Sequence, residues 1–308
     1  MQYFNATLNQ TIILFTFIIC GFVLRRSGVV GDGSSSVLSK LEASVFIPAL
    51  IINTFMTRFT VENIKNMYSY ILWASLLLAV AFPIGVALSR VFAKDRYTRR
   101  IYIYSMSIAN FGFMGNAVVL GAFGEDMLFR YMLFTIPINM FTYSIGVAML
   151  KPDFRLSIRT FANPVVFSLI IGAVLGLTGL GTLLPSFIES TVSMVAACMS
   201  PIAMILTGMV VAEYKICELI KNGKVYICTV LRLLIIPALF VGILYLFGVN
   251  NDNYTITLAI CAFAMPLGLN TVVYPSAYGA DTKLGASMAL ISHSISIITI
   301  PVMFLIFT

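Results

Sequence analysis

The sequence predicts an all-α polytopic membrane protein, with ten transmembrane helices arranged as two inverted five-helix repeats. Three observations lead to this class: 60% of the 308 residues are hydrophobic, only 10% are charged, and the mean hydropathy is +0.99. Soluble domains carry about 25% charged residues, so the polar groups that would cover a water-soluble surface are missing. Apolar runs of about 20 residues, enough to cross the hydrocarbon of a bilayer, recur over the whole length.

Ten candidate spans follow one another with short connections, which leave no room for a separate soluble domain. Their expected limits are 5–25, 36–57, 68–90, 100–122, 126–150, 162–180, 186–212, 222–248, 254–278 and 283–307. The first run lacks the basic start and the small-residue cleavage site of a signal peptide, so we expect it to be retained as a span.

Lys and Arg lie mostly in one set of alternating loops: fifteen are found there, three lie in the other set, and the nineteenth, Arg232, falls inside the eighth span. Positive residues favour the cytoplasmic side of a membrane, so both termini are expected outside, with the plasma (inner) membrane as the expected location. The net charge of +7 then favours contact with the anionic headgroups of a lipid bilayer. We expect no nucleic acid as a partner. Arg232 is expected to snorkel to the inner interface.

The chain lacks the groups that catalysis or metal binding needs. It has one histidine and no clustered carboxylates, so we expect no enzyme, no cofactor and no metal. The five cysteines show no paired spacing and are expected to pack as small hydrophobic residues. No Asp, Glu or Lys is expected at a span centre, where a charge would cost about 2.5–3.5 kcal/mol. The coupling ion, proton or sodium, therefore stays open.

The two halves of the chain, 1–150 and 151–308, carry similar residues in corresponding spans. The matched pairs, in chain order, are Gly21 with Gly172, Pro48 with Pro201, Pro83 with Pro237, Asn116 with Asn270, and Asp126 with Asp281. Their separation rises slowly from 151 to 155 residues, which chance placement of Gly and Pro does not explain well. A five-span unit that is used twice must be inverted in its second copy, and inverted repeats are typical of secondary transporters.

Spans four and nine are expected to be broken helices that cross near the membrane midplane. Gly, Pro and Asn interrupt both, in 107–117 and 264–275, and broken backbone is tolerated at that depth only inside protein or beside a wet cavity. Half-helix N-termini would direct partial positive charge at an anionic substrate. The candidate substrate-binding residues are Asn110, Gly115, Asn116, Gly268, Asn270 and Thr271. The alternative is a pair of kinked packing helices.

Other polar residues are also expected at membrane depth. Asn53, Asn139 and Ser200 are supporting candidates for substrate binding, although a buried Asn often joins helices by hydrogen bonds instead. His293 lies in a polar stripe of the last span. It is a candidate for a proton relay, because histidine titrates near neutral pH, and the alternative is a packing role.

The chain resembles the auxin efflux carrier family, which includes bacterial permeases associated with malate or malonate. The resemblance is carried by Asn110-Phe-Gly-Phe-Met-Gly-Asn-Ala117, Met265-Pro-Leu-Gly-Leu-Asn-Thr271 and Tyr278-Gly-Ala-Asp281. It implies a scaffold domain of spans 1, 2, 6 and 7 and a transport domain of spans 3–5 and 8–10, which moves in an elevator-like displacement. The family carries a proline in each broken helix, whereas this chain has Ala117 and Thr271 at those positions.

These features together predict a secondary active transporter that moves a small organic anion, auxin- or malate-like, by alternating access, with efflux as the family's usual direction. The alternatives are a passive channel or facilitator and, from another class, a membrane enzyme or ligand sensor. Homodimer formation is left open. Replacing Asn116 or Asn270 by Ala is expected to impair transport with little loss of expression.

Overall fold

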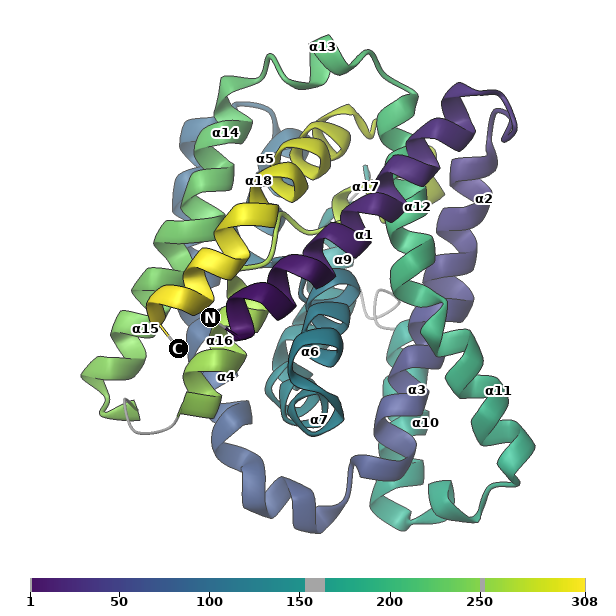
Figure 1. The fold of residues 1–308 in the computed structure, drawn as a ribbon, viewed down its shortest axis with the longest axis vertical. Helices are drawn as coiled ribbons and strands as arrows, with labels where there is room; N and C mark the ends of the chain where they lie inside the picture. The colour runs from purple at the N-terminus through teal and green to yellow at the C-terminus, as the bar shows by residue number, and fades with distance from the viewer. Residues whose placement is uncertain (1, 153–163, 250–252, 308) are drawn as a thin grey trace.

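The computed structural model describes residues 2–152, 164–249 and 253–307, and within these ranges the chain is helical, with turns and without a β-strand. In chain order its elements are α1 (Gln2–Arg26), α2 (Ser34–Leu41), η1 (Glu42–Phe46), α3 (Ile47–Arg58), α4 (Val61–Phe92), α5 (Arg96–Ser107), η2 (Phe111–Gly115), α6 (Asn116–Phe123), α7 (Glu125–Phe134), α8 (Ile136–Phe141), η3 (Thr142–Gly146), α9 (Val147–Met149), α10 (Pro164–Thr178), η5 (Leu180–Leu183), α11 (Ser186–Ala197), α12 (Met199–Ala212), α13 (Ile216–Leu219), α14 (Gly223–Val230), η6 (Leu231–Ile235), α15 (Ile236–Leu246), α16 (Asn253–Phe263), α17 (Asn270–Ala277) and α18 (Lys283–Phe307), where η marks a π-helical or 3₁₀ turn. Figure 1 shows α6 and α7 in the middle of the molecule, between α3, α10 and α11 on one side and α4, α14 and α15 on the other.

Each predicted span coincides with one helix or with helices that follow one another. Six are long and apolar enough to cross a membrane: Tyr3–Arg26, Ser34–Arg58, Met67–Phe92, Ser186–Ala212, Gly223–Leu246 and Lys283–Phe307. The bent pair Glu125–Phe134 and Ile136–Met149 makes a seventh if it is one span, and shorter apolar helices occupy Phe111–Phe123, Pro164–Thr178 and Tyr254–Phe263. The chain is therefore an integral polytopic membrane protein. The start of the sixth predicted span, at 162–163, lies outside the described residues.

Two spans differ from the expected straight helices. The third begins at Val61, seven residues earlier than expected, and has a kink at Met67, whose backbone is not helical. The fifth bends by 53° between α7 and α8. Pro137 causes this bend, because proline has no amide hydrogen for the carbonyl one turn earlier and its ring disfavours helix in the preceding turn.

Two pairs of helices approach each other closely through glycine. α1 packs along α12, and α3 packs along α10. A Cβ at Gly21 would collide with the backbone of Ile205, and a Cβ at Gly172 would collide with Phe55. Small residues at such contacts let helix backbones approach, which strengthens van der Waals packing in lipid. The matched glycines of the two halves thus make corresponding contacts, span one with span seven and span six with span two.

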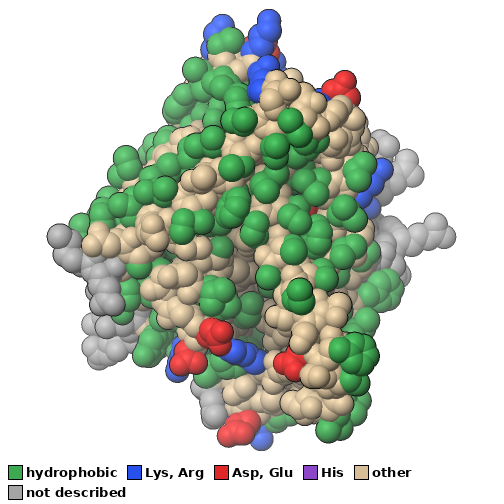
Figure 2. Space-filling view, turned by 45° about the vertical axis from the view of Figure 1, so that its right-hand side comes forward, with side chains coloured by type: hydrophobic (Ala, Val, Ile, Leu, Met, Phe, Trp, Pro, Cys, Tyr) green, Lys and Arg blue, Asp and Glu red, His purple; other side chains and the backbone are tan. Residues whose placement is uncertain are grey.

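The outer surface carries many large apolar side chains, including Ile19, Leu76, Phe167, Val174 and Ile298, all at least a third exposed. Figure 2 shows that apolar side chains cover the middle of one face, while charged side chains gather toward its ends. A soluble monomer rarely exposes so large an apolar surface. A face of this kind fits a hydrocarbon layer between two headgroup regions.

The turns η1 and η6 each lie directly before a proline-containing helix, and each holds a buried ionisable side chain. Pro48 follows η1 and Pro237 follows η6, and a missing proline amide favours a π-helical turn before it. The ionisable side chains of Glu42 and Arg232, in these two turns, are both fully buried. The expectation that Arg232 snorkels to the interface is therefore wrong, because its guanidinium is enclosed by protein.

Candidate functional site

The fourth and ninth predicted spans are both interrupted, and the interruptions lie against each other. Helix is absent from 108–110 and from 264–269. Between these two segments, Ala109 and Leu267 form an antiparallel backbone bridge. The two breaks expected from Gly, Pro and Asn therefore meet inside the protein, where neighbouring side chains satisfy backbone groups that lipid could not.

Asn110 ties the first break to the second break and to the last helix. Its amide donates to the carbonyl of Pro266 at 2.8 Å, and its Oδ1 accepts from the amide of Met114 at 3.4 Å. Its Nδ2 lies 3.0 Å from Nε2 of His293, whose Nδ1 lies 2.8 Å from the carbonyl oxygen of Ala289. A carbonyl oxygen only accepts, so Nδ1 carries the hydrogen and Nε2 accepts from Asn110. Both ring nitrogens of His293 are therefore occupied.

The polar stripe of α18 supports the broken backbone. His293 is 2% exposed, and it lines none of the cavities described below. Its neighbour Ser292 accepts a hydrogen bond from the amide of Leu267 at 3.2 Å. A role for His293 as a proton relay stays a prediction, while the observed contacts are those of a packing residue.

Two tyrosines that the sequence analysis missed also bind to the crossing, the region where the breaks at 108–110 and 264–269 meet. The hydroxyl of Tyr131 lies 2.8 Å from the carbonyl oxygen of Phe111 and 3.2 Å from that of Cys261, so it contacts both broken helices. The hydroxyl of Tyr104 accepts from Nδ2 of Asn270 at 2.5 Å. Tyrosine is common in apolar spans, and no spacing in the sequence distinguishes these two.

Three predicted site residues pack within the crossing. A Cβ at Gly115 would collide with the hydroxyl of Tyr131, and a Cβ at Gly268 would collide with the ring of Tyr104. Thr271 donates its hydroxyl to the carbonyl of Gly268 at 2.9 Å. These residues allow close approach of the two breaks, and none of the three lines a cavity formed by the described residues.

The largest of the cavities described here has a volume of about 670 Å³ and lies between α1, α3, α6, α7, α11 and α12. It is named the outer cavity after the orientation that the distribution of Lys and Arg predicts. It brings together three predicted site residues, Asn53, Asn116 and Ser200. The hydroxyl of Ser200 donates to the carbonyl of Phe113 at 2.6 Å. This bond joins α12 to the helix that follows the first break, η2 and α6, which is named here the first half-helix.

Charged side chains also line the outer cavity. Arg58 on α3 and Glu125 on α7 form an ion pair of 3.5 Å, and Glu189 on α11 is a further lining residue. Both partners of the pair are substantially exposed to solvent, where an ion pair contributes about 0–1 kcal/mol. This pair therefore links α3 to α7 only weakly.

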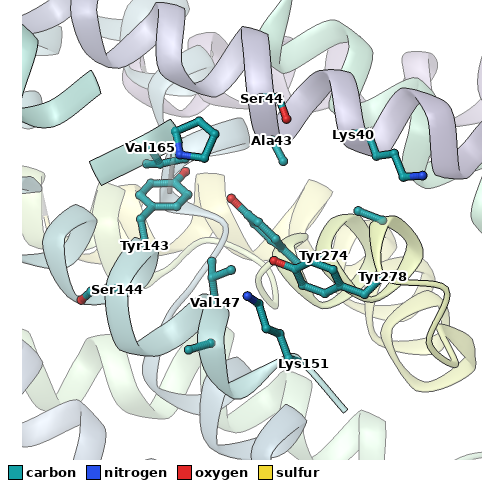
Figure 3. A pocket seen from close by; sticks show the side chains of 13 residues that line it. Lys40, Ala43, Ser44, Tyr143, Ser144, Val147, Lys151, Val165, Tyr274 and Tyr278 are labelled. Atoms are coloured by element: carbon teal, nitrogen blue, oxygen red, sulfur yellow. The ribbon is translucent and has the colours of Figure 1, made fainter. Parts of the chain in front are cut away.

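A second cavity, the inner cavity, has a volume of about 280 Å³ and is lined by η1, η3, α9, α10 and α17 together with Lys40 and Lys151. Tyr143, Tyr274 and Tyr278 supply hydroxyl groups. In Figure 3 the hydroxyl ends of Tyr143 and Tyr274 point toward each other, and Lys151 reaches toward Tyr278, over whose ring its Nζ lies at 5.1 Å from the centroid. No acidic side chain lines this cavity among the described residues, so its lining is cationic.

A narrow cavity of about 20 Å³, named here the waist, lies between the other two. Along the second span the inner cavity is lined by residues 40–44, the waist by 47–55 and the outer cavity by 50–58. Tyr143 lines both the inner cavity and the waist, and Asn116 lines both the waist and the outer cavity. A space of this size holds about one water molecule.

The waist is formed where the first half-helix faces α3. Gly112 and Asn116, four residues apart on this half-helix, both line it, together with the predicted residue Asn139. The first amides of a helix have no partner within the helix, and Gly112 has no side chain to cover its amide. The first turn of the half-helix, which is partially positive, thus lies beside the waist. Asn139 donates to Thr135 at 3.4 Å.

Arg232 lies where the first segments of both broken helices end. Its Nη1 donates to the carbonyl of Met106 at 3.1 Å, and its guanidinium lies 5.7 Å from the ring centroid of Phe263. Met106 and Phe263 belong to the last turns of α5 and α16, where the carbonyl ends of helices are partially negative. No acidic side chain pairs with it among the described residues, so the carbonyl end of α5 and the ring of Phe263 are the contacts shown for its charge.

Comparisons with known proteins agree with a transporter. A family model described as a membrane transport protein matches residues 6–157 and 153–304. An uncharacterized transporter of Methanothermobacter thermautotrophicus is 22% identical over 306 residues, which cover 97% of each chain. An uncharacterized transporter of Methanocaldococcus jannaschii is 21% identical over 306 residues, which cover 95% of this chain and 96% of that relative.

Proposed function

Since this chain belongs to the membrane transport protein family, the family of the auxin efflux carriers, we propose that it is a secondary carrier that moves a small organic anion across the membrane by alternating access. Membership of a transporter family favours transport over a membrane enzyme or a ligand sensor. The substrate, the direction and the mechanism of movement are the parts that we propose.

The observation that carries the proposal is the waist. Cavities of about 670 and 280 Å³ are separated by one of about 20 Å³. An organic anion fits either large cavity, but the waist has room for about one water molecule. Passage from one cavity to the other therefore requires the walls to move, which favours a carrier over an open channel or facilitator.

The chemistry of the lining supports an anion as the substrate. Lys40 and Lys151 make the inner cavity cationic, and lysines in a cleft raise the local concentration of anions. At the waist, the amide of Gly112 and the side-chain amide of Asn116 are hydrogen-bond donors at the positive end of the first half-helix. A carboxylate only accepts hydrogen bonds, so these groups suit it. A cationic inner cavity also favours efflux, because it collects anions from the side that we take as cytoplasmic.

The packing supports an elevator-like movement. The glycine contacts of α1 with α12 and of α3 with α10 would form a rigid scaffold of spans 1, 2, 6 and 7. The crossing and its supporting tyrosines belong to spans 3–5 and 8–10, which would move as the transport domain. We propose that this arrangement arises from inverted repeats at 1–150 and 151–308, with ten spans and both termini outside.

A test of the proposal begins with a thermal-shift screen of organic acids, including malate, malonate and indole-3-acetate, on the purified protein. Any acid that stabilises the protein is then tested in proteoliposomes by counterflow of the labelled acid. Carrier transport predicts that unlabelled acid inside accelerates uptake of label. Uptake without such acceleration would indicate a channel, and consumption of the acid without movement would overturn transport.

A further inference from the structure

Glu42 is a carboxylate buried inside the membrane domain. It belongs to η1, in the second predicted span, and is fully buried. Neither of its carboxylate oxygens has a hydrogen-bond partner among the described residues. The sequence analysis did not find it. Ser35, Ser39 and Glu42 have helical spacing, and the structure shows that all three are buried on one face.

A carboxylate in such a place is not stable as an anion. Ionised carboxylates accept several hydrogen bonds or pair with a cation when they are buried, and an isolated one takes up a proton instead. The described residues contain no group of three or more His, Cys, Asp or Glu side chains that could hold a metal ion. A proton is therefore the occupant that this environment favours.

Glu42 lies between two sets of helices. Its turn η1 packs against α10, α11 and α12 and also against α17. Its neighbours Ala43 and Ser44 line the inner cavity together with Tyr143 and Tyr274. The turn that carries this carboxyl group thus borders the inner cavity, and α17 is one of the elements that cover the turn.

The charged groups around this turn are few. Lys40 on α2, Arg58 on α3 and Glu189 on α11 are the charged side chains of the packed elements, while α10, α12 and α17 contain none. Beyond the end of α12, Glu213 accepts a hydrogen bond from Ser35 at 2.7 Å. No ion pair of Glu42 occurs within the described ranges.

We propose that Glu42 is a proton-binding site whose protonation controls the movement of α17, a proposal that rests on the transport function above. The carboxylate takes a proton from water of the inner cavity when α17 is displaced. Only the neutral acid allows α17 to pack against η1 as observed. When α17 is displaced again, the proton returns to water of the inner cavity, so the pH on that side sets how often the packed arrangement forms.

The first test measures the protonation state and needs no substrate. Infrared spectra of the reconstituted protein at neutral pH should contain the carbonyl stretching band of a protonated carboxylic acid. This band should be lost in Glu42→Gln. It should be kept in the control Glu213→Gln, which alters an exposed carboxylate that accepts a hydrogen bond from Ser35 on the neighbouring α2. Absence of a difference between wild type and Glu42→Gln would show that Glu42 is ionised and would overturn the proposal.

The second test separates control by protonation from transport, with labelled malate as the probe. Wild-type counterflow should slow as the pH at the inner cavity rises, whereas counterflow by Glu42→Gln should persist and lose this dependence on pH, because glutamine mimics the neutral acid at every pH. The same pH dependence in the wild type and the variant would overturn the role of Glu42. Absent counterflow in the wild type would count against malate transport, and the infrared band would still decide the proton site.

Discussion

The two broken helices contain matching asparagines that lie in very different surroundings. Asn116, in the first half of the chain, lines both the waist and the outer cavity. Asn270, in the second half, is 5% exposed and donates to the hydroxyl of Tyr104 at 2.5 Å. Equivalence in sequence therefore does not mean equivalence in role. In this arrangement the half-helix after the first break faces two cavities, and the second break packs against the first.

The largest effect that would test this difference is expected for Asn116→Ala. If Asn116 donates to a substrate carboxylate, its loss removes a hydrogen bond to a charged group, worth about 1.5–3 kcal/mol, or roughly tenfold to a hundredfold in affinity. The measurement is the concentration of acid that gives half-maximal counterflow. Thermal stability in detergent should match the wild type, since the side chain lines a cavity. Unchanged affinity would remove Asn116 from the binding site.

Asn270→Ala should instead lower stability. The change leaves the buried hydroxyl of Tyr104 without its donor, which costs about 1–3 kcal/mol. The sequence analysis expected the same outcome for both asparagines, and the structure separates them. Thermal unfolding in detergent measures the loss, and transport per folded molecule should be retained.

The double variant Asn270→Ala/Tyr104→Phe is the matched control for this loss. Removing both partners is less costly than removing one, so the double variant should be more stable than Asn270→Ala alone. Equal stability of wild type and Asn270→Ala would show that the second break does not depend on this contact.

A smaller effect is expected for the lysines of the inner cavity. Lys40→Gln and Lys151→Gln should each weaken anion binding by about twofold to fivefold at low salt, the range expected for exposed charges. The difference should shrink at high salt, because exposed charges are screened. Lys221→Gln, on an exposed residue that lines none of the described cavities, should have no effect. Equal losses at all three positions would indicate a general charge effect.

The smallest effect on transport is expected at the start of α5, at the opposite end of this helix from the first break. The amide of Thr98 donates to Oδ1 of Asp95 at 2.8 Å, and this hydrogen bond lowers the pKa of Asp95. A lowered pKa means that the cap stabilises the helix above the ordinary pKa of Asp and loses this effect as the pH falls through the folded-state value. Asp95→Ala should cost about 1 kcal/mol in thermal unfolding and leave counterflow unchanged. Loss of transport in Asp95→Ala would show that the N-terminal end of α5 affects the crossing.

Much of the fold was predictable from composition and spacing, because lipid requires long apolar runs and tolerates broken backbone only inside protein. The segments around Asn110 and Gly268 showed where helices would break. Sequence could not show that Gly115 and Thr271 pack while Asn116 faces a cavity, because this depends on which side of a half-helix meets α3. Ten spans, the inverted repeat and the site itself stay predictions.

The missed residues share a physical reason. Tyr104 and Tyr131 act through single hydroxyl groups that reach partners far away in the chain, and no local pattern reveals such a contact. Glu42 lies near the beginning of its span, where a carboxylate is ordinarily expected to reach water. Its burial follows from the packing of η1 against α12 and α17. The residue pattern within one span does not show which other helices will cover it.

Alternating access is tested most directly by distances across the two cavities in a lipid bilayer. Spin labels at Arg58→Cys and Glu125→Cys report on the outer cavity, and labels at Lys40→Cys and Lys151→Cys report on the inner one, each pair in a chain without its native cysteines. Pulsed electron paramagnetic resonance should give two distances for each pair, and a change of pH or addition of malate that lengthens one pair should shorten the other. A single distance for each pair that no condition alters would contradict a moving carrier.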